Sequence, residues 1–528
     1  MNNRPASLFP RLLPPLAALA AGGLTVFAFA PFGLWPLQIL TLALVFMLAL
    51  RSSGFAQSAL IGWAYSSGIL IAGVHWLYIS MHRYGGMPGW MAALAVVLLS
   101  VALSAYAALG FGLAGWLRRR ASLGASATTV SALLLLPAVW TLAEWLRGWI
   151  FTGFPWVSAG YAHTSGPLAG YAPVVGVYGL ALISGVIAGC IALLPKSTGI
   201  GRHALPVGLA LAILAGGLIL KQIRWTTPHG APISVRLLQG NVPQEMKFAP
   251  EQLQASLALY HASITRRPAD LIATPETAIP LLSTQLPPDY LGLLSKFAQD
   301  SGSHIALGIP VSDGPRQYAN SVLGLVPNPA AQAYRYDKHH LVPFGEFIPP
   351  GFRWFVEMMH IPLGDFNRGI LLQKPFAVKD QWVMPNICYE DLFGEEIAAQ
   401  LSAGATSGMP QATILLNMSN IAWFGDSIAL PQHLQISQLR AMETGRPMLR
   451  ATNTGATAHV GPDGAVIAQL EPFTQGELET KVQGYAGLTP YSRLGNVPAV
   501  IAALLALGVA AARLRKGGKN APHAGKTR

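Results

Sequence analysis

Apolar stretches long enough to cross a lipid bilayer dominate the first 225 residues of this 528-residue chain. A bilayer core about 30 Å thick takes about 20 apolar residues in a helix. Inside lipid a backbone must satisfy its own hydrogen bonds, so these stretches predict a bundle of transmembrane α-helices. Hydropathy places about eight spans at Leu12–Ala30, Leu34–Leu50, Gln57–Ser80, Trp90–Leu117, Thr128–Leu146, Tyr171–Leu194, Leu205–Leu220 and Val497–Ala512.

The composition agrees with a large lipid-facing surface. Hydrophobic residues make up 52% of the chain and charged residues only 11%, whereas a soluble protein carries about 25% charged residues. The net charge is +12, but the basic residues form short clusters beside apolar stretches and do not line one polar face. This distribution argues against a nucleic-acid partner and indicates membrane topology.

The basic clusters predict how the spans are oriented, because cytoplasmic loops carry an excess of Lys and Arg. The apolar run after Arg11 has no convincing cleavage site, so we interpret it as a retained first span and not a signal peptide. A cytoplasmic N terminus then places the clusters at Arg51, 118–120, Lys196 with Arg202, and 513–519 in the cytoplasm. The predicted organisation is a transmembrane domain of about seven spans (1–225), an extracytoplasmic domain (226–490), a last transmembrane helix (491–515) and a basic cytoplasmic tail (516–528).

Aromatic and charged residues gather at 75–84 and 144–156, where two predicted spans leave the membrane. They fit either an aromatic belt at the interface or one wall of a lipid-facing site. Glu144 is the acidic residue within the predicted spans, which makes it a functional candidate. Arg147 follows three residues later and could instead pair with it.

From about Ser234 the pattern changes to short β-rich runs that alternate with amphipathic helices, which predicts an α/β domain. A Pro-Asp-Gly turn at 462–464 predicts a hairpin and therefore a mixed sheet. Three reactive residues follow apolar strands: Glu276, Lys338 and Cys388. Side chains at strand ends can meet in one crevice, so we expect these three to lie together.

Each of the three has an ordinary alternative: a cysteine can be core filler, a lysine a solvated turn, and a glutamate a helix cap. Together they suit nucleophilic catalysis. A thiol with a pKa of about 8.5 is mostly protonated at neutral pH, so it needs a base and a nearby cation that favours the thiolate. Glu276 and Lys338 supply both, and Lys338 could also stabilise an oxyanion. Cys190 lies in a predicted span, so a disulfide with Cys388 is not expected.

The motifs TPETAIP, YDKHHLVPFGEFIP and ICYED, which surround these residues, resemble those of the nitrilase superfamily. Five further motifs, FTGFPW, GGMPG, QGNVPQ, NMSNIAWFGDS and GRPMLRATNTG, make the chain similar from end to end to the membrane-bound apolipoprotein N-acyltransferases. The resemblance implies an extracytoplasmic αββα sandwich in which Glu276 is the general base, Lys338 stabilises the oxyanion and Cys388 is the nucleophile. It also implies roles in activity for Glu346, Tyr389 and Glu390.

The same resemblance implies a ping-pong reaction in a bacterial inner membrane, with the catalytic domain in the periplasm and without a cofactor or metal. Cys388 would take an acyl chain from a phospholipid, usually phosphatidylethanolamine, and pass it to the N-terminal amine of a diacylglyceryl apolipoprotein. In this chain Phe248 stands where the family usually has Trp. Asn417, Trp423 and Phe424 could line an acyl pocket or be ordinary loop and core residues. The apolar segment Gly351–Phe366 is either a membrane-dipping lid or a core helix.

Two other functions use the same features. An amidase or nitrile hydrolase would employ the same three residues with water as acceptor, but small soluble substrates do not require eight spans. A transporter or receptor would place polar residues along several spans, and the spans carry few charges apart from Glu144. The scattered histidines and the two distant cysteines predict no metal site.

Overall fold

The computed structural model describes residues 9–519 except 53, 122–123, 197–199, 247–249, 316, 350, 352 and 355–364. The chain forms two compact units. The first unit contains residues up to His75, Ala93–Ile223 and the stretch from Asn496. The second unit contains Arg224–Gly495 together with the short segment Trp76–Ala92.

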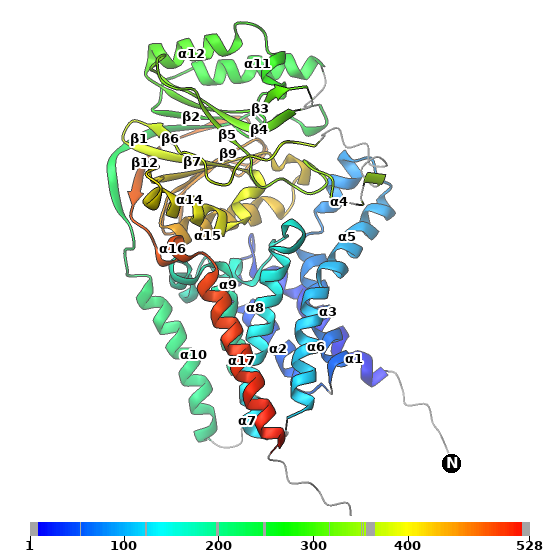
Figure 1. Ribbon diagram of the computed structural model, residues 1–528. Helices are drawn as coiled ribbons and strands as arrows, with labels where there is room; N and C mark the ends of the chain where they lie inside the picture. Colours follow the sequence, from blue (N-terminus) through cyan, green and yellow to red (C-terminus); the bar gives the residue numbers. More distant parts are fainter. Residues whose placement is uncertain are drawn as a thin grey trace, which may run out of the picture. The chain divides into compact units, whose positions relative to one another are not determined.

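The first unit is helical (Figure 1). Its helices are α1 (Phe9–Leu24), α2 (Pro36–Ala49), α3 (Phe55–Gly73), α6 (Ala105–Arg119), α7 (Ala125–Val130), α8 (Leu136–Arg147), α9 (Ala172–Leu193), α10 (Ile200–Leu220) and α17 (Val497–Lys519), joined by most of α5 (Gly89–Leu103). Among the described residues, six helical stretches are long and apolar enough to cross a membrane, and two shorter apolar helices precede them. The expected membrane-type helical unit is therefore present.

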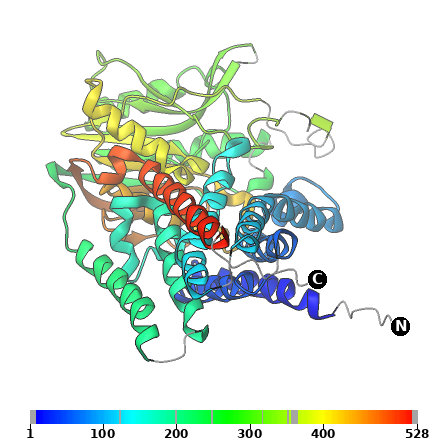
Figure 2. The same cartoon turned by 60° about the horizontal axis from the view of Figure 1, so that its bottom comes forward.

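Glycines allow the helices of this unit to pack closely. A Cβ atom on Gly68 of α3 would lie 2.2 Å from the carbonyl oxygen of Leu19 in α1, and one on Gly22 of α1 would lie 2.1 Å from that of Tyr65. Small residues of this kind let two backbones approach in lipid, where apolar burial does not drive helix association. Figure 2 views these helices obliquely from the end at which α17 finishes.

Several helix boundaries differ from the sequence prediction, and two of the differences are large. The predicted span Gln57–Ser80 ends early, because α3 stops at Gly73 and residues from Trp76 belong to the second unit. The predicted span Trp90–Leu117 is interrupted at Ser104, between α5 and α6. The Ser104 hydroxyl donates to the Ser100 carbonyl at 2.7 Å, and such back-bonding bends helices.

Glu144 and Arg147 form a buried ion pair at the end of α8, with a separation of 3.9 Å. Arg147 also donates to the carbonyls of Phe154 and Trp156, while Glu144 accepts from the backbone N–H of Ala159. The pairing alternative for Glu144 is therefore realised, and the pair anchors the loop that follows α8.

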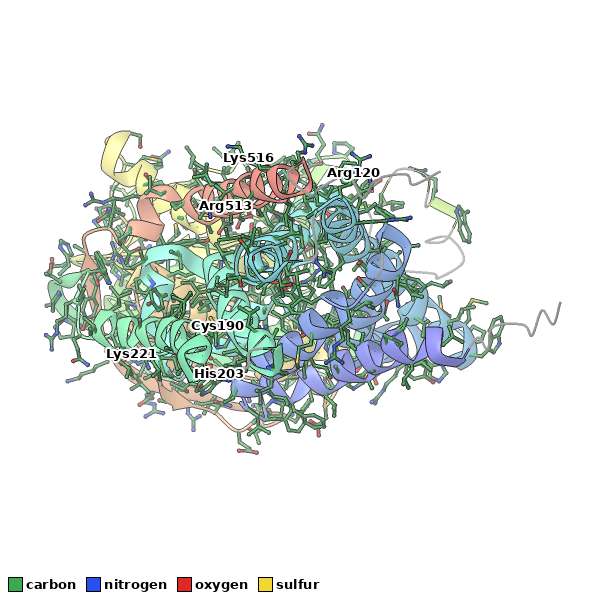
Figure 3. The ribbon with its side chains drawn as sticks, turned by 90° about the horizontal axis from the view of Figure 1, so that it is seen from below. Arg120, Cys190, His203, Lys221, Arg513 and Lys516 are labelled. Atoms are coloured by element: carbon green, nitrogen blue, oxygen red, sulfur yellow. The ribbon has the colours of Figure 1, made fainter. Side chains whose placement is uncertain are left out.

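Basic side chains mark one end of the first unit. Arg120 follows α6, and Arg513 and Lys516 lie on the last turns of α17. The ends of these two helices point the same way in Figure 1, and Figure 3 views the three side chains from that end.

The second unit contains two six-stranded sheets with strand orders β12-β1-β2-β3-β4-β5 and β11-β10-β9-β8-β7-β6. The strands of the first are β1 (Thr227–Gln239), β2 (Leu271–Ala273), β3 (His304–Gly314), β4 (Gln317–Leu325), β5 (Tyr334–Asp337) and β12 (Gly476–Ala486). Those of the second are β6 (Phe376–Val378), β7 (Gln381–Ile387), β8 (Ile414–Ser419), β9 (Met448–Thr452), β10 (Ala458–Val460) and β11 (Val466–Gln469). Both sheets are mixed, and the antiparallel pair β10–β11 forms the hairpin predicted at 462–464.

Alternation along the strands builds three apolar layers. Val235 and Leu237 of β1 join Leu416 and Leu449 of the other sheet in the core between the sheets, whereas Leu238 faces the opposite way. Helices α11 (Pro250–Thr265) and α12 (Tyr290–Ser301) cover the outer face of the first sheet, and α14 (Gly394–Thr406) and α15 (Ala429–Thr444) cover that of the second (Figure 1). This arrangement confirms the expected αββα sandwich.

Candidate active site

Cys388 occupies a sharp turn directly after β7. It is the first residue of a short 3-10 helix, Cys388–Leu392, and its φ of +53° lies in the left-handed region that side chains other than glycine rarely adopt. The amide of Asn417 on the neighbouring strand β8 donates to the Cys388 carbonyl at 3.1 Å. A nucleophile on such a turn is lifted out of the strand and held by its surroundings.

Lys338 follows β5, at the end of the other sheet. Its backbone N–H donates to the Asn320 carbonyl at 2.8 Å, and its Nζ donates to Glu346 Oε1 at 2.9 Å and to Glu276 Oε1 at 3.3 Å. Burial by itself lowers the pKa of Lys338, but the carboxylates of Glu276 and Glu346 outweigh it and raise that pKa above its usual value. The site therefore contains a permanent buried cation.

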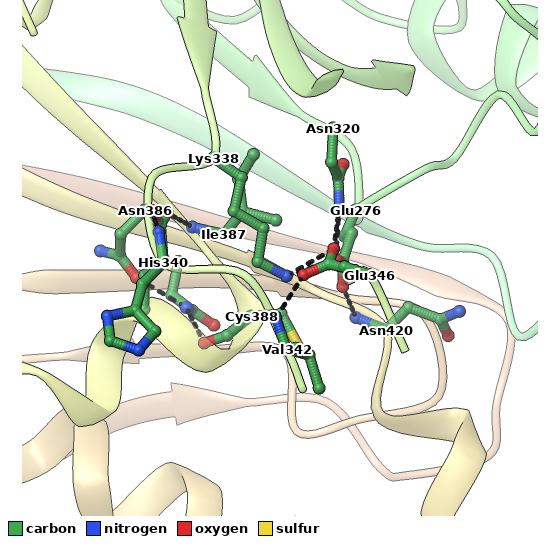
Figure 4. A network of polar contacts seen from close by, with 12 residues as sticks. Glu276, Asn320, Lys338, His340, Val342, Glu346, Asn386, Ile387, Cys388 and Asn420 are labelled. Carbon is green, nitrogen blue, oxygen red and sulfur yellow. Dashed lines mark hydrogen bonds and ion pairs between the residues drawn. The ribbon is translucent and has the colours of Figure 1, made fainter. Parts of the chain in front are cut away.

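Glu276 and Glu346 are held by a shared partner. The Asn320 amide nitrogen donates to Oε1 of Glu276 at 2.8 Å and to Oε1 of Glu346 at 2.9 Å. The second oxygen of Glu276 accepts from the Asn420 backbone N–H at 2.9 Å, and that of Glu346 accepts from the Val342 N–H at 2.8 Å. Figure 4 shows the side chains of Glu276, Lys338, Glu346 and Cys388 converging on one point.

The charges around Cys388 set its resting state. Burial raises the pKa of the Cys388 thiol, Glu276 and Glu346 raise it further, and Lys338 opposes them; the net pKa lies well above the ordinary value. The sequence suggested that Lys338 would favour the thiolate. With two carboxylates beside it, one cation does not suffice, so the thiol stays protonated until a base removes its proton.

Glu390 ties the nucleophile turn to the loop after Lys338. Its Oε2 accepts from the Ile387 N–H at 2.6 Å and from the Tyr336 hydroxyl at 2.9 Å, and its Oε1 accepts from the backbone N–H groups of His339 and His340 at 2.6 and 3.1 Å. Burial raises the pKa of Glu390 to about 7. The adjacent residue, Tyr389, packs its ring 5.2 Å from that of Phe393.

The other residues predicted from the sequence lie in three different settings. Asn417 is fully buried and bonds to Asn386 as well as to Cys388. Trp423 and Phe424 contact the segment Trp76–Ala92, with ring centroids 5.7 Å from Tyr84 and 4.2 Å from Trp76 respectively. Phe248 and residues 355–364 of the predicted lid lie outside the described residues.

Asn320 was missed from the sequence. It lies in the middle of β4, where the polar pair Asn320 and Ser321 between apolar residues is the only signal of a buried hydrogen-bonding role. Within the described ranges, the titratable side chains do not form a group of three suited to a metal ion. The arrangement is suited to covalent catalysis by a thiol with a carboxylate base and a fixed cation.

Comparison with known proteins agrees with this chemistry. Residues 21–190 match the family described as the apolipoprotein N-acyltransferase N-terminal domain, and residues 234–491 match the carbon-nitrogen hydrolase family. The apolipoprotein N-acyltransferase of Ralstonia nicotianae is 51% identical over 96% of this chain and 95% of its own length. That of Nitrosomonas europaea is 46% identical over 94% of this chain and 97% of its own.

The chain belongs to the apolipoprotein N-acyltransferase family. The family resemblance inferred from the motifs is thereby confirmed. In this N-acyltransferase, Glu276, Lys338 and Cys388 all fall within the carbon-nitrogen hydrolase match. Among solved structures, an amidase from Nesterenkonia sp. aligns at 20% identity with 49% of this chain and 92% of its own length, with a TM-score of 0.35.

Proposed function

We propose that the protein transfers an acyl chain from a membrane phospholipid to the N-terminal amine of a diacylglyceryl apolipoprotein through a thioester on Cys388. The observation that carries the proposal is the convergence of Cys388 with Lys338, Glu276 and Glu346 in a chain whose close relatives are N-acyltransferases. Those relatives favour acyl transfer over hydrolysis, the alternative that the same residues allow.

In the first half-reaction Glu276 removes the proton from Cys388 Sγ as the sulfur attacks the ester carbonyl of the phospholipid. The oxyanion that forms is stabilised by Lys338 Nζ, whose charge is held in place by Glu346. The C–O bond then breaks, and the lysophospholipid oxygen takes the proton from Glu276. Cys388 is left as a thioester.

In the second half-reaction the free amine of the apolipoprotein attacks the thioester carbonyl. Glu276 accepts a proton from the amine, the C–S bond breaks, and the departing sulfur of Cys388 takes that proton back. The product is an amide, which is more stable than the thioester, so the transfer proceeds to completion.

We infer supporting roles for the remaining residues. Glu390 and Tyr389 hold the nucleophile turn against the loop that follows Lys338. Asn417 donates a hydrogen bond to the Cys388 carbonyl. Trp423, Phe424 and Phe248 supply apolar surface for the acyl chain.

The donor is phosphatidylethanolamine, and the protein lies in the bacterial inner membrane with its catalytic unit in the periplasm and both termini in the cytoplasm. The basic residues at one end of the helical unit support this orientation, because positive charge is retained on the cytoplasmic side.

The test is to incubate the purified protein with phosphatidylethanolamine in the absence of an acceptor. We expect one acyl mass on the peptide that contains Cys388, released by hydroxylamine and absent from the Cys388→Ala variant. The Cys190→Ala variant is the matched control and should keep the adduct. Transfer by Cys388→Ala would refute the nucleophile, and free fatty acid released at the full turnover rate would identify a hydrolase.

A further inference from the structure

A buried ionic network lies behind the nucleophile turn and has no part in the chemical steps above. Asp391, the third residue after Cys388, contacts His433 and Ser437 of α15 and Arg450 of β9. These four side chains are at most 1% exposed. Such a buried charge pair needs an explanation, because replacing it with apolar residues is often neutral or stabilising.

The hydrogen bonds of the network fix its protons. Arg450 Nη2 lies 2.8 Å from His433 Nδ1, and a guanidinium can only donate, so Nδ1 accepts. The single ring proton is therefore on Nε2, which donates to Asp391 Oδ1 at 2.9 Å. The Ser437 hydroxyl and Arg450 Nη1, at 3.1 Å, donate to Asp391 Oδ2. Burial raises the pKa of Asp391, but His433, Arg450 and Ser437 together bring it below its ordinary value.

The network fixes one end of a strained turn. The left-handed conformation of Cys388 costs about 1–2 kcal/mol and persists only when its surroundings determine it. Asn417 holds the start of the turn through the Cys388 carbonyl, and Asp391 holds its far side through α15 and β9. Asn417 and Arg450 are cross-strand partners in the β8–β9 ladder, so both attachments rest on the same pair of strands.

We propose that Asp391, His433 and Arg450 are positioning residues that hold the Cys388 turn so that its sulfur faces Glu276 and Lys338. The proposal rests on the proposed role of Cys388 as nucleophile. If the network had a purely structural role, disrupting it would lower the stability of the protein without changing the reactivity of Cys388. If the network positions the turn, disrupting it slows the reactions of Cys388. The size of this effect then depends on whether residue 433 keeps its hydrogen bond to Asp391.

The experiment compares His433→Met with His433→Gln in the full-length protein carrying Cys190→Ala, so that the alkylated thiol is Cys388. Met fills the volume without hydrogen bonds, whereas Gln keeps a donor for Asp391. We expect the rate of iodoacetamide alkylation and the kcat of acyl transfer to fall about 100-fold in His433→Met, as for a displacement of about 1 Å. KM should be unchanged, and His433→Gln should recover most of both rates.

The matched control is His459→Met. His459 is another buried histidine of the same unit, and its Nδ1 lies 3.0 Å from the Thr480 hydroxyl on β12. This variant should lose stability but keep the wild-type alkylation rate. The proposal is overturned if His433→Met is alkylated at the wild-type rate while its melting temperature falls as in the control.

The test remains decisive even if His433→Met does not fold or the proposed function is wrong. If His433→Met does not fold, Ser437→Ala takes its place, because it removes one of the donors to Asp391 Oδ2. Slower alkylation of Cys388 than in the wild type then supports the proposal, and the wild-type rate overturns it. Alkylation of Cys388 needs no lipid, so its rate reports on the turn independently of acyl transfer. Retained transfer in Cys388→Ala would refute the proposed function alone.

Discussion

Lys338 Nζ donates a 2.9 Å hydrogen bond to Oε1 of Glu346, a carboxylate on the loop that begins at the end of its own strand. Both side chains are buried, at 1% and 7% exposure. At this depth an ammonium is retained only with its counter-charges, so Glu346 and Glu276 together fix the position of the Lys338 ammonium.

The first prediction concerns this pair. Glu346→Gln should keep the shape of the site but weaken the hold on Lys338, and kcat for acyl transfer should fall about 100-fold because the oxyanion loses a fixed cation. Steady-state transfer in detergent measures this. Asp300→Asn, which removes a surface ion pair with Lys296, is the control and should leave kcat unchanged. A Glu346→Gln variant with more than half of the wild-type kcat would contradict the assignment.

The second prediction separates two roles of Glu276, as the base that takes the thiol proton and as the negative charge that raises the pKa of Cys388. After burial, the negative charge of Glu276 is the largest cause that raises the pKa of Cys388. Glu276→Gln removes that charge, so the pKa of Cys388 should fall and the midpoint of its iodoacetamide alkylation profile should move to lower pH. Acyl transfer should nevertheless be lost, because no base remains to take the thiol proton.

Alkylation as a function of pH and acyl transfer at one pH measure the two effects in the same preparation. Only the combination of a lower midpoint and lost transfer agrees with Glu276 as the base. An unchanged midpoint would show that its charge does not act on Cys388.

The sequence predicted Glu276, Lys338 and Cys388 because each follows an apolar strand, and the sheet geometry that brings strand ends together is local and regular. It could not predict Asn320, since its role depends on how the loops after β2 and β5 fold back over β4. The network of Asp391, His433 and Arg450 was equally hidden, because it joins a turn, a helix and a strand that are separate in the sequence.

For the membrane helices, too, some features could be predicted from the sequence and others could not. Hydropathy located the apolar stretches because composition alone decides them. It missed the break at Ser104 and the early end of α3, because hydrogen bonding by one serine and the packing of Trp76 against Phe424 are specific contacts that an averaged hydropathy does not contain.

The third prediction concerns Asn320, which donates to both carboxylates of the site. Asn320→Ala should lower the free energy of unfolding by about 1.5–3 kcal/mol, the worth of a hydrogen bond to a charged group, and should lower kcat more than it raises KM. Thermal unfolding and steady-state kinetics measure the two effects. Asn320→Asp places a third carboxylate beside Glu276 and Glu346, so its activity should be lower still; higher activity than Asn320→Ala would contradict the bridging role.

The last prediction concerns the Glu144–Arg147 pair in the helical unit. Arg147→Met leaves the buried Glu144 without its counter-charge and removes the donors to Phe154 and Trp156, so it should destabilise the protein by about 3–5 kcal/mol. The double variant Glu144→Gln/Arg147→Met removes both charges and should be more stable than Arg147→Met alone, because no unpaired ion remains. Thermal unfolding in detergent ranks the variants. If the double variant were the less stable of the two, the loss would come from the Ala159 contact and the loop, and the ion pair would not be its cause.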